Sequence, residues 1–415
     1  MPFGRKRKLF GESDEEREET GVVGVGERVE PFALRYVRER EVGIVRGANL
    51  IQQAKERFFG RQLSVINERE FDSQGYDKAF AAAWLDGATV LVGTKCNQLL
   101  KLDVDGKVFS KISLGNEAAT AEAVGRDVCG IHSVVLNPSE TLVATGGPDP
   151  KQCAVFDTQG LTRQQLFEGH RDWVFGMDWL DDEHFVSGSR DKSVKIWKFD
   201  PTLGPVAGPV GEHSTTDSHE AKVRDVKYCK AENAIISVSL DGKIRTWDPD
   251  RLECMSEFEL NSIHRSEIAC TAVKDSLLAV GCRDWIAMVD LRMDHQYWAL
   301  ELVHPDFSVR SLQYHDDVLS CGTGNGWISF IDVRRSQRYM ELERPVCRGK
   351  AVRTDYHLEV GEGTKTDGPF WHLLEGVQTG NAVYAHCWDR SRSRMFACGG
   401  PLSAGLKGCY MGVWE

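Results

Sequence analysis

One stretch of the sequence limits the possible fold more than any other. Between Gly169 and Trp197 it reads GHRDWVFGMDWLDDEHFVSGSRDKSVKIW. A Gly-His pair opens the stretch, and three short apolar runs follow, with a tight turn expected at 189–191 before the third run. Such runs are the length of strands rather than of helices. The stretch therefore predicts three short antiparallel β-strands.

The same three-strand unit recurs along the chain. When the repeats are aligned on their first strands, they begin near Phe80, His132, Phe175, Arg224, Ala269, Arg310 and Tyr384. In each repeat a second run ends in Gly or Ser before a turn, and a third run ends in an aromatic or aliphatic residue. Seven such units predict an all-β fold, a seven-bladed WD-repeat β-propeller. A Trp-Asp pair itself occurs at a third-strand end once, at Trp247-Asp248.

Polar residues in the opening stretch allow two interpretations. His170, Ser187, Asp191 and Trp197 are the types that hydrogen-bond to one another within a blade of this repeat. A Ser, a His and an Asp are also the members of a hydrolase triad. The same repeat skeleton recurs where the catalytic types are missing, which favours the structural interpretation. Because no GxSxG or HExxH motif occurs, we expect a protein that is not an enzyme and needs no cofactor.

Composition excludes several other classes. The net charge of −11 argues against general nucleic-acid binding, which requires a basic surface. The twelve cysteines form no CxxC pair and no zinc spacing with His, so we expect reduced thiols and no metal site. No run of 18 apolar residues occurs and no signal peptide is apparent, so we expect a soluble protein without a membrane partner.

The region before the repeats divides into two parts. Residues 1–28 combine the basic run Arg5 to Lys8 with acidic residues after Ser13, which predicts a disordered charged tail. The basic run is either a nuclear localisation signal or a solvated segment; with reduced thiols, the first interpretation predicts a cytoplasmic and nuclear protein. Residues 29–60 predict two short helices. Their apolar sides either pack on the propeller or form a docking arm for a partner.

The predicted propeller spans 61–415 and contains two predicted insertions, 200–218 and 336–380. The longer one is polar and punctuated by Gly, and has room for a hairpin, for example 339–343 with 356–360. The last repeat ends after its third strand, at Trp414, so its blade lacks an outer strand. Residues 63–71 have a suitable pattern and precede the first repeat. We expect them to pair with the last strand and close the ring, which removes an exposed edge.

Basic residues gather at one end of the predicted ring. Turns between second and third strands and the starts of first strands lie at the same end, and together they carry Lys95, Arg190, Arg283, His132, Lys222, Arg224 and Arg310. In a cup of low dielectric these groups would attract carboxylates or phosphates. The alternative is that they fall there by chance or pair with nearby acids such as Asp191 and Asp284. A second pattern, Asp-x-Arg, follows two consecutive third strands, at 290–292 and 332–334.

Particular fragments carry a resemblance to a known family. They are Val92 to Asn97, Cys129 to His132, Asn137 to Ser139, Ser187 to Asp191, Lys222 to Arg224, and Gly399 to Leu402. With them, most of 30–415 resembles the twelfth family of the numbered damaged-DNA-binding-adaptor- and cullin-4-associated factors. These are WD-repeat substrate receptors of cullin-4 RING ubiquitin ligases, non-catalytic subunits that present substrate proteins for ubiquitination.

The resemblance implies roles for individual residues. Substrates of this family end in Glu-Glu or Glu-Leu, and the residues expected to bind such acidic C-termini here are Lys95, His132, Arg190, Lys222, Arg224 and Arg310. The residues expected to contact the adaptor, and cullin-4 and RING through it, are Phe32, Leu34, Val37, Ile51, Phe58, Asp290, Arg292, Asp332 and Arg334. The family signature has Trp before Asp-x-Arg, whereas this chain has Val289 and Ile331.

Overall fold

The described part of the chain is almost entirely β-structure. The computed structural model describes residues 66–73, 75–115, 130–203, 209–210, 214–216, 219–260, 268–283, 285–293, 297–301, 308–333, 338–339, 341–346, 350–355, 357–361, 364–366, 380–402 and 406–415. Gly60–Glu415 forms one compact unit. The predicted charged tail and the two predicted helices of 29–60 lie outside the described residues.

Seven antiparallel sheets form the blades, each with an inner, two middle and an outer strand. Blade 1 contains β2 (Ala79–Trp84), β3 (Thr89–Thr94), β4 (Leu99–Asp103) and β5 (Val108–Ile112). Blade 2 contains β6 (Val134–Leu136), β7 (Leu142–Gly146), β8 (Cys153–Asp157) and β9 (Arg163–Phe167). Blade 3 contains β10 (Val174–Trp179), β11 (His184–Ser189), β12 (Val194–Lys198) and β14 (Ser214–Thr216).

The second half of the propeller repeats this order. Blade 4 contains β15 (Val223–Cys229), β16 (Ala234–Ser239), β17 (Lys243–Trp247) and β18 (Cys254–Glu259). Blade 5 contains β19 (Cys270–Lys274), β20 (Leu277–Gly281), β21 (Trp285–Asp290) and β22 (Tyr297–Glu301). Blade 6 contains β23 (Val309–His315), β24 (Val318–Thr323), β25 (Trp327–Asp332) and β26 (Arg338–Tyr339). Blade 7 contains β31 (Asn381–Trp388), β32 (Met395–Pro401), β33 (Lys407–Trp414) and β1 (Glu68–Glu70).

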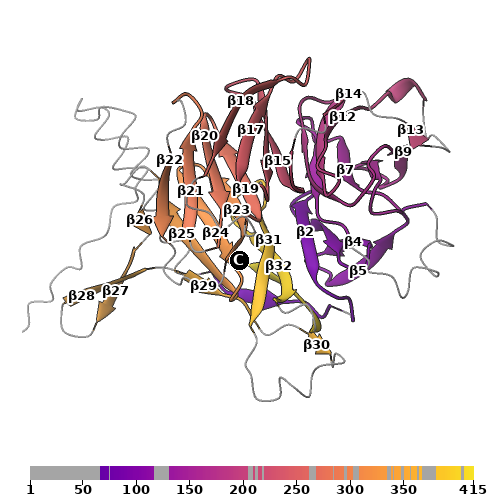
Figure 1. Cartoon of the computed structure of the whole chain (residues 1–415). Helices are drawn as coiled ribbons and strands as arrows, with labels where there is room; N and C mark the ends of the chain where they lie inside the picture. Colours follow the sequence, from indigo (N-terminus) through magenta and orange to yellow (C-terminus); the bar gives the residue numbers. More distant parts are fainter. Residues whose placement is uncertain are drawn as a thin grey trace, which may run out of the picture. The chain divides into compact units, whose positions relative to one another are not determined.

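The inner strands form a closed circuit. Each contacts the next in the order β2, β6, β10, β15, β19, β23, β31 and back to β2. In Figure 1, β2, β15, β19, β23 and β31 lie toward the middle of the propeller, whereas outer strands such as β5, β18 and β22 lie nearer its edge. The predicted seven-bladed propeller is therefore confirmed, and the seven repeat starts each fall in a different blade.

Burial along a blade explains why its strands differ in sequence. The middle strand β16 (AIISVS) is buried at every position, as expected for a strand covered by blades on both faces. The outer strand β18 (CMSEFE) is mostly exposed and carries two glutamates. Apolar side chains thus pack between neighbouring blades, and the core consists of layers that separate one blade from the next.

The ring is closed by pairing the two ends of the propeller. Strand β1 pairs antiparallel with β33, with Glu68 opposite Trp414 and Glu70 opposite Gly412. The backbones of Asn67 and Glu415 exchange two further hydrogen bonds, of 2.9 and 3.1 Å. This confirms the prediction that residues before the first repeat supply the outer strand of the last blade. A second short strand, β30 (Thr364–Thr366), pairs with the other end of β33.

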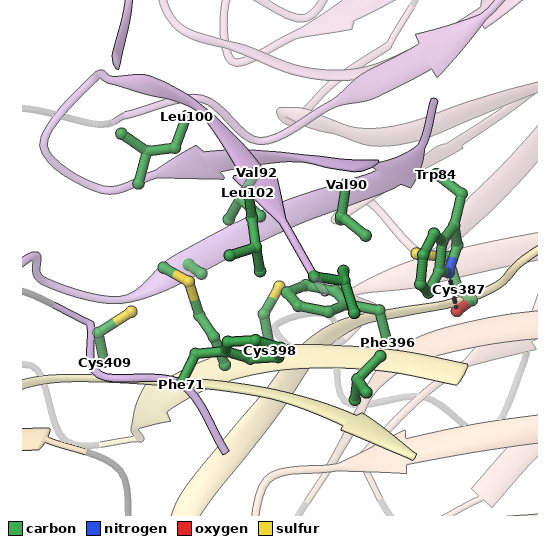
Figure 2. Close-up of a cluster of buried hydrophobic side chains, with 14 residues drawn as sticks. Phe71, Trp84, Val90, Val92, Leu100, Leu102, Cys387, Phe396, Cys398 and Cys409 are labelled. Atoms are coloured by element: carbon green, nitrogen blue, oxygen red, sulfur yellow. Dashed lines mark hydrogen bonds between the residues drawn. The ribbon is translucent and has the colours of Figure 1, made fainter. Parts of the chain in front are cut away.

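A cluster of buried side chains lies beneath this closure. Phe71, just after β1, packs with side chains from blades 1 and 7, among them Val92, Leu102, Phe396 and Cys398 (Figure 2). The backbone N–H of Phe71 also donates to Met411 O at 2.9 Å. The segment that closes the ring therefore contributes an apolar side chain to the core as well as strand pairing.

Polar side chains pin the turn of blade 3 to the segment that enters it. The two ring nitrogens of His170 hydrogen-bond to Asp191 Oδ2 at 2.9 Å and to Ser187 Oγ at 2.7 Å, and Trp197 Nε1 donates to the same Ser187 Oγ at 2.7 Å. The structural interpretation is confirmed, because the Ser187 hydroxyl is fully buried and occupied by these two partners. Blade 4 repeats the arrangement with His219, Ser237, Asp241 and Trp247.

The two predicted insertions contain strands that join the blades. Within 200–218, after a short 3-10 helix (Pro201–Leu203), β13 (Pro209–Val210) pairs parallel with β9, and β14 is the outer strand of blade 3. Within 336–380 there is a hairpin, but it joins β27 (Glu341–Val346) to β28 (Lys350–Asp355). The suggested partner segment instead forms β29 (His357–Glu359), which pairs with β25. The suggested pairing was therefore wrong.

Candidate ligand-binding site at the centre of the propeller

Each blade places one residue near the start of its inner strand around the centre. In five of the inner strands the register shifts by one residue near the start, and the residues left out of the pairing are Phe80, Phe175, Arg224, Arg310 and Tyr384. Such a β-bulge re-aims a side chain away from the regular pleat. His132 and Ala269 occupy the corresponding repeat positions in blades 2 and 5. We call these seven residues the collar.

The collar surrounds a cavity of about 600 Å³. All seven collar residues line it, as do residues further along the inner strands, including Lys227, Gln313 and His386. Of the six residues predicted to bind an acidic C-terminus, the structure brings His132, Arg224 and Arg310 together on this cavity. Lys95, Arg190 and Lys222 are not among the residues that line it.

One side of the collar is aromatic. The ring of Phe80 stacks on His132 with centroids 4.5 Å apart and makes an edge contact with Tyr384 at 5.1 Å. His132 in turn makes an edge contact with Phe175 at 5.1 Å. The guanidinium of Arg224 lies 4.6 Å from the centre of the Phe175 ring. This cation–π contact fixes a positive charge at the border of the aromatic arc.

The basic part of the collar comes from blades 4 and 6. Arg224 in blade 4 and Arg310 in blade 6 line the cavity on either side of blade 5, whose collar residue is the small Ala269. Nε of Arg310 is buried and has no hydrogen-bond partner. Two guanidinium groups on one cavity suit a carboxylate or phosphate ligand, because arginine donates charge-assisted hydrogen bonds to such anions.

The remaining predicted basic residues lie at the same end, in the turns beside the strand starts. Lys95 N–H donates to Lys78 O at 2.8 Å, Arg190 N–H donates to Trp173 O at 2.8 Å, and Lys222 O accepts from Leu240 N–H at 3.1 Å. These bonds tie each turn to the start of the inner strand of its own blade. We call this outer set the rim.

Two rim cations already have acidic partners. Lys95 Nζ lies 2.7 Å from Asp77 Oδ2, and Arg190 Nε lies 3.5 Å from Asp172 Oδ2. Arg190 also stacks over Trp173, with its guanidinium 4.6 Å from the ring centre. The alternative interpretation of paired surface charges thus holds for part of the basic set, although the acids are not the ones expected from the sequence.

A further cation, Lys78, lies beside the rim and was not predicted from the sequence. Lys78 precedes β2, is only 3% exposed, and has the left-handed backbone angle φ of 40°. Burial, and then the charge of Lys95, lower the pKa of the Lys78 ammonium group. Lys78 directly precedes a strand that begins Ala-Phe-Ala, and no charge pattern in this part of the sequence indicates a binding residue.

Three of the nine residues predicted to contact the adaptor lie in the described part of the chain. The Arg292 side chain donates two hydrogen bonds to Asp290 in its own turn, from Nε at 2.9 Å and from the terminal nitrogen at 2.7 Å, and the Arg292 backbone N–H donates a third at 3.1 Å. Arg292 is exposed there, so the ion pair lies on the surface at the end of β21. Asp332 ends β25, whereas Arg334, Phe32, Leu34, Val37, Ile51 and Phe58 lie outside the described residues.

Within the described ranges, no three His, Cys, Asp or Glu side chains are grouped so as to hold a metal ion. The same ranges contain no helix with the length and hydropathy needed to span a bilayer.

Two solved structures resemble the propeller. One is described as the RRP9 WD40 repeats, with a TM-score of 0.59 and 12% identity, covering 84% of this chain and 98% of that one. The other, described as the structure of U3-55K, has a TM-score of 0.59 and 13% identity and covers 83% and 98% of the two chains. At this identity the likeness concerns the fold alone.

Two Arabidopsis thaliana proteins match parts of the chain. Actin-interacting protein 1-2 is 26% identical over 115 residues, which is 25% of this chain and 19% of that protein. DENN domain and WD repeat-containing protein SCD1 is 25% identical over 168 residues, which is 39% of this chain and 13% of that protein. The matches thus span less than a fifth of either relative's length.

A family match covers far more of the chain. Residues 63–207 and 202–415 match the family described as the DDB1- and CUL4-associated factor 12 beta propeller. Together these ranges include every blade of the structure, from the strand that closes the ring to the last strand of blade 7. The chain therefore belongs to the DDB1- and CUL4-associated factor 12 propeller family.

Proposed function

We propose that this protein is the substrate receptor of a cullin-4 RING ubiquitin ligase and binds acidic C-termini, ending in Glu-Glu or Glu-Leu, at the collar and rim. It is a non-catalytic subunit: it selects the protein to be ubiquitinated and degraded, and other subunits carry out the transfer. The family description, which names an adaptor and a cullin, supports the ligase assignment.

The observation that carries the ligand assignment is the pair of arginines on the central cavity. Arg224 and Arg310 lie on the same cavity of about 600 Å³ in a protein whose net charge is −11. A chain that ends in two glutamates presents three carboxylates within two residues. Arginine donates to carboxylates with a fixed fork of N–H groups, and such bonds are roughly twice as strong as neutral ones.

Attachment to the adaptor is assigned to the surface outside the cavity. Asp290 and Asp332 end the third strands of blades 5 and 6, and Arg292 follows the first of these strands, away from the turns that form the rim. The helical arm predicted for 29–60 would supply further contacts. Separate surfaces for adaptor and substrate allow the receptor to hold both at once. We also propose that the protein acts in both cytoplasm and nucleus, which fractionation of cells expressing a tagged full chain would test.

Two peptides that differ only at the end test the ligand assignment. One ends in Glu-Glu with a free carboxylate, and the other is the same peptide with an amidated end. Both are titrated with purified full-length protein at near-physiological salt, where loose surface attraction is screened. We expect tight binding of the free acid and a loss of binding on amidation. Equal weak binding of both peptides would refute a receptor for C-termini.

Charge reversal locates the site, and co-purification tests the ligase. Arg224→Glu should abolish peptide binding without unfolding, because it removes a contact worth about 1.5–3 kcal/mol and adds repulsion. Arg390→Glu, a reversal of an 85%-exposed side chain outside the collar and rim, is the control and should leave binding unchanged. Failure of adaptor and cullin-4 to co-purify with a protein that still binds peptide would instead favour a ligase-independent scaffold for acidic or phosphorylated segments.

A further inference from the structure

The turn that joins β31 to β32 repeats arginine and serine. From 389 to 394 it reads DRSRSR, and its serines, Ser391 and Ser393, are the only two in the chain that lie between two arginines. Strand β31 starts near the collar residue Tyr384, so the turn at its other end lies far from the rim. We call residues 389–394 the arginine turn. It takes no part in the proposed ligand site.

Each arginine of this turn forms an ion pair with an acidic residue of another blade. The pairs are Arg390 with Glu140 of blade 2 at 2.9 Å, Arg392 with Asp316 of blade 6 at 2.5 Å, and Arg394 with Asp105 of blade 1 at 3.1 Å. The first two arginines are exposed, so each of their pairs contributes little stability alone. Together the pairs tie blade 7 to three other blades.

Both serines are exposed, and a buried carboxylate holds the turn around them. Asp389 is only 5% exposed. It accepts a hydrogen bond from the Ser391 hydroxyl, and the backbone N–H groups of Ser393 and Arg394 donate to it at 2.8 and 3.0 Å. Ser393 Oγ lies 2.7 Å from Ser391 Oγ. A change at Ser391 Oγ would therefore act directly on the residue that organises the turn.

We propose, independently of the function above, that the arginine turn is a phosphorylation site for an arginine-directed serine kinase. Such a kinase transfers the γ-phosphoryl group of ATP to a serine Oγ, while ADP leaves and the hydroxyl proton passes to a base of the kinase. The flanking arginines supply cations that carboxylates in a kinase substrate groove can bind. The strand pairing ends at Trp388 and Met395, so both serines lie outside it and few backbone hydrogen bonds oppose their presentation.

Phosphorylation at Ser391 should exchange the partners of two arginines. The phosphate carries a charge of about −1.5 to −2 at neutral pH and cannot donate to Asp389 as the hydroxyl does. Repulsion by this buried carboxylate turns the phosphate outward, where the neighbouring Arg390 and Arg392 are attracted to it. Both arginines then leave their carboxylate partners, and blade 7 loses its links to blades 2 and 6.

The first test incubates folded full-length protein with ATP, Mg²⁺ and a recombinant SR-protein kinase, which acts on serines beside arginine. Tandem mass spectrometry should locate phosphate on Ser391 or Ser393. None is expected on Ser311, which also follows an arginine but is 7% exposed and lies 2.7 Å from His386 Nδ1. Turn serines that stay unmodified in the folded protein overturn the proposal. A synthetic peptide of residues 386–397 then shows whether recognition or the fold is the reason.

The second test measures the effect of charge at the turn without the kinase. Ser391→Glu adds a negative charge, and Ser391→Gln is its neutral match of similar shape. We expect Ser391→Glu to melt about 1–3 °C below Ser391→Gln, because the ion pairs that it weakens are exposed and individually small. The gap should narrow in the background Glu140→Gln/Asp316→Asn, where both acidic partners are already absent. Phosphorylated wild-type protein should likewise melt below the unmodified protein.

The two tests can fail separately. A Ser391→Glu variant at least as stable as Ser391→Gln, or a phosphorylated protein that melts no lower than the unmodified one, would show that phosphate does not loosen blade 7. Phosphate mapped to the arginine turn would still establish the modification site. Because the turn lies far from the rim, binding of a Glu-Glu peptide should stay at the wild-type value in both Ser391 variants.

Discussion

The ring closure makes a quantitative prediction about Phe71. This side chain is 4% exposed and packs in the cluster between blades 1 and 7 (Figure 2). Its ring also makes an edge contact with the ring of Phe109, at a centroid distance of 6.4 Å. Phe71→Ala removes the ring and leaves the backbone hydrogen bond to Met411 in place. Truncation of a buried Phe costs about 3–5 kcal/mol, because lost burial and the remaining cavity both contribute. We expect a loss of this size in the free energy of unfolding.

The assay is equilibrium unfolding in guanidinium chloride, followed by tryptophan fluorescence. Met255→Ala is the control, because Met255 lies on β18 with 51% of its surface exposed and its truncation should leave the midpoint nearly unchanged. Limited trypsin digestion supplies a second readout, since loosening of the closure would expose the bond after Arg69 on β1. An unchanged midpoint and unchanged cleavage in Phe71→Ala would show that the first segment does not hold the ring closed.

Three further outcomes are expected. Ser187→Ala removes the hydroxyl that a buried His and a buried Trp share in blade 3. Unfolding experiments should show that the free energy of unfolding falls by about 1–3 kcal/mol, whereas Ser110→Ala, at an exposed serine, should leave it unchanged. Burial lowers the pKa of His386 from 6.5 to about 4, so between these pH values the unfolded chain binds more protons. Stability should therefore fall by up to about 3 kcal/mol as pH decreases from 7 to 4, and denaturation at several pH values should show a shallower fall in His386→Phe. Phe175→Leu removes the ring under Arg224 and should weaken Glu-Glu peptide binding by about 0.5–2 kcal/mol, whereas Phe175→Tyr should retain it; equal affinities in titrations of both would exclude a positioning role.

Much of the fold was predictable because each repeat carries its own local signal. The tetrad of blade 3 follows from four residue types at fixed spacing, and ring closure follows from a last repeat without an outer strand. The same tetrad in blade 4 was missed because no Gly precedes His219, so the opening pair of the motif is absent. The hairpin of the longer insertion was predicted at the wrong residues. The pattern in 357–359 is typical of a strand but does not specify its partner, which is β25, distant in sequence.

The candidate site was predictable only in part, because its geometry depends on backbone bulges. Alignment of the repeats put the seven collar residues at equivalent positions, but the basic ones alone were selected as functional. A recurrent signal was present: Ala or Val precedes the bulged residue in each of the five shifted strands. This pattern distinguishes Arg224 and Arg310, which lie at bulges and line the central cavity, from Lys95 and Arg190, which lie in turns.

The difference between collar and rim bears on how the site distinguishes ligands. Lys95 and Arg190 each lie near an acid, so an incoming carboxylate must compete with Asp77 or Asp172 and gains little net energy from either cation. Arg310 has a buried nitrogen without a hydrogen-bond partner, and a carboxylate there satisfies a group that otherwise remains costly. Discrimination should therefore come from the collar and the cavity below it, while the rim mainly attracts anionic segments toward the opening. Raised salt should therefore weaken the contribution of the rim first, because salt screens exposed charges more strongly than buried ones.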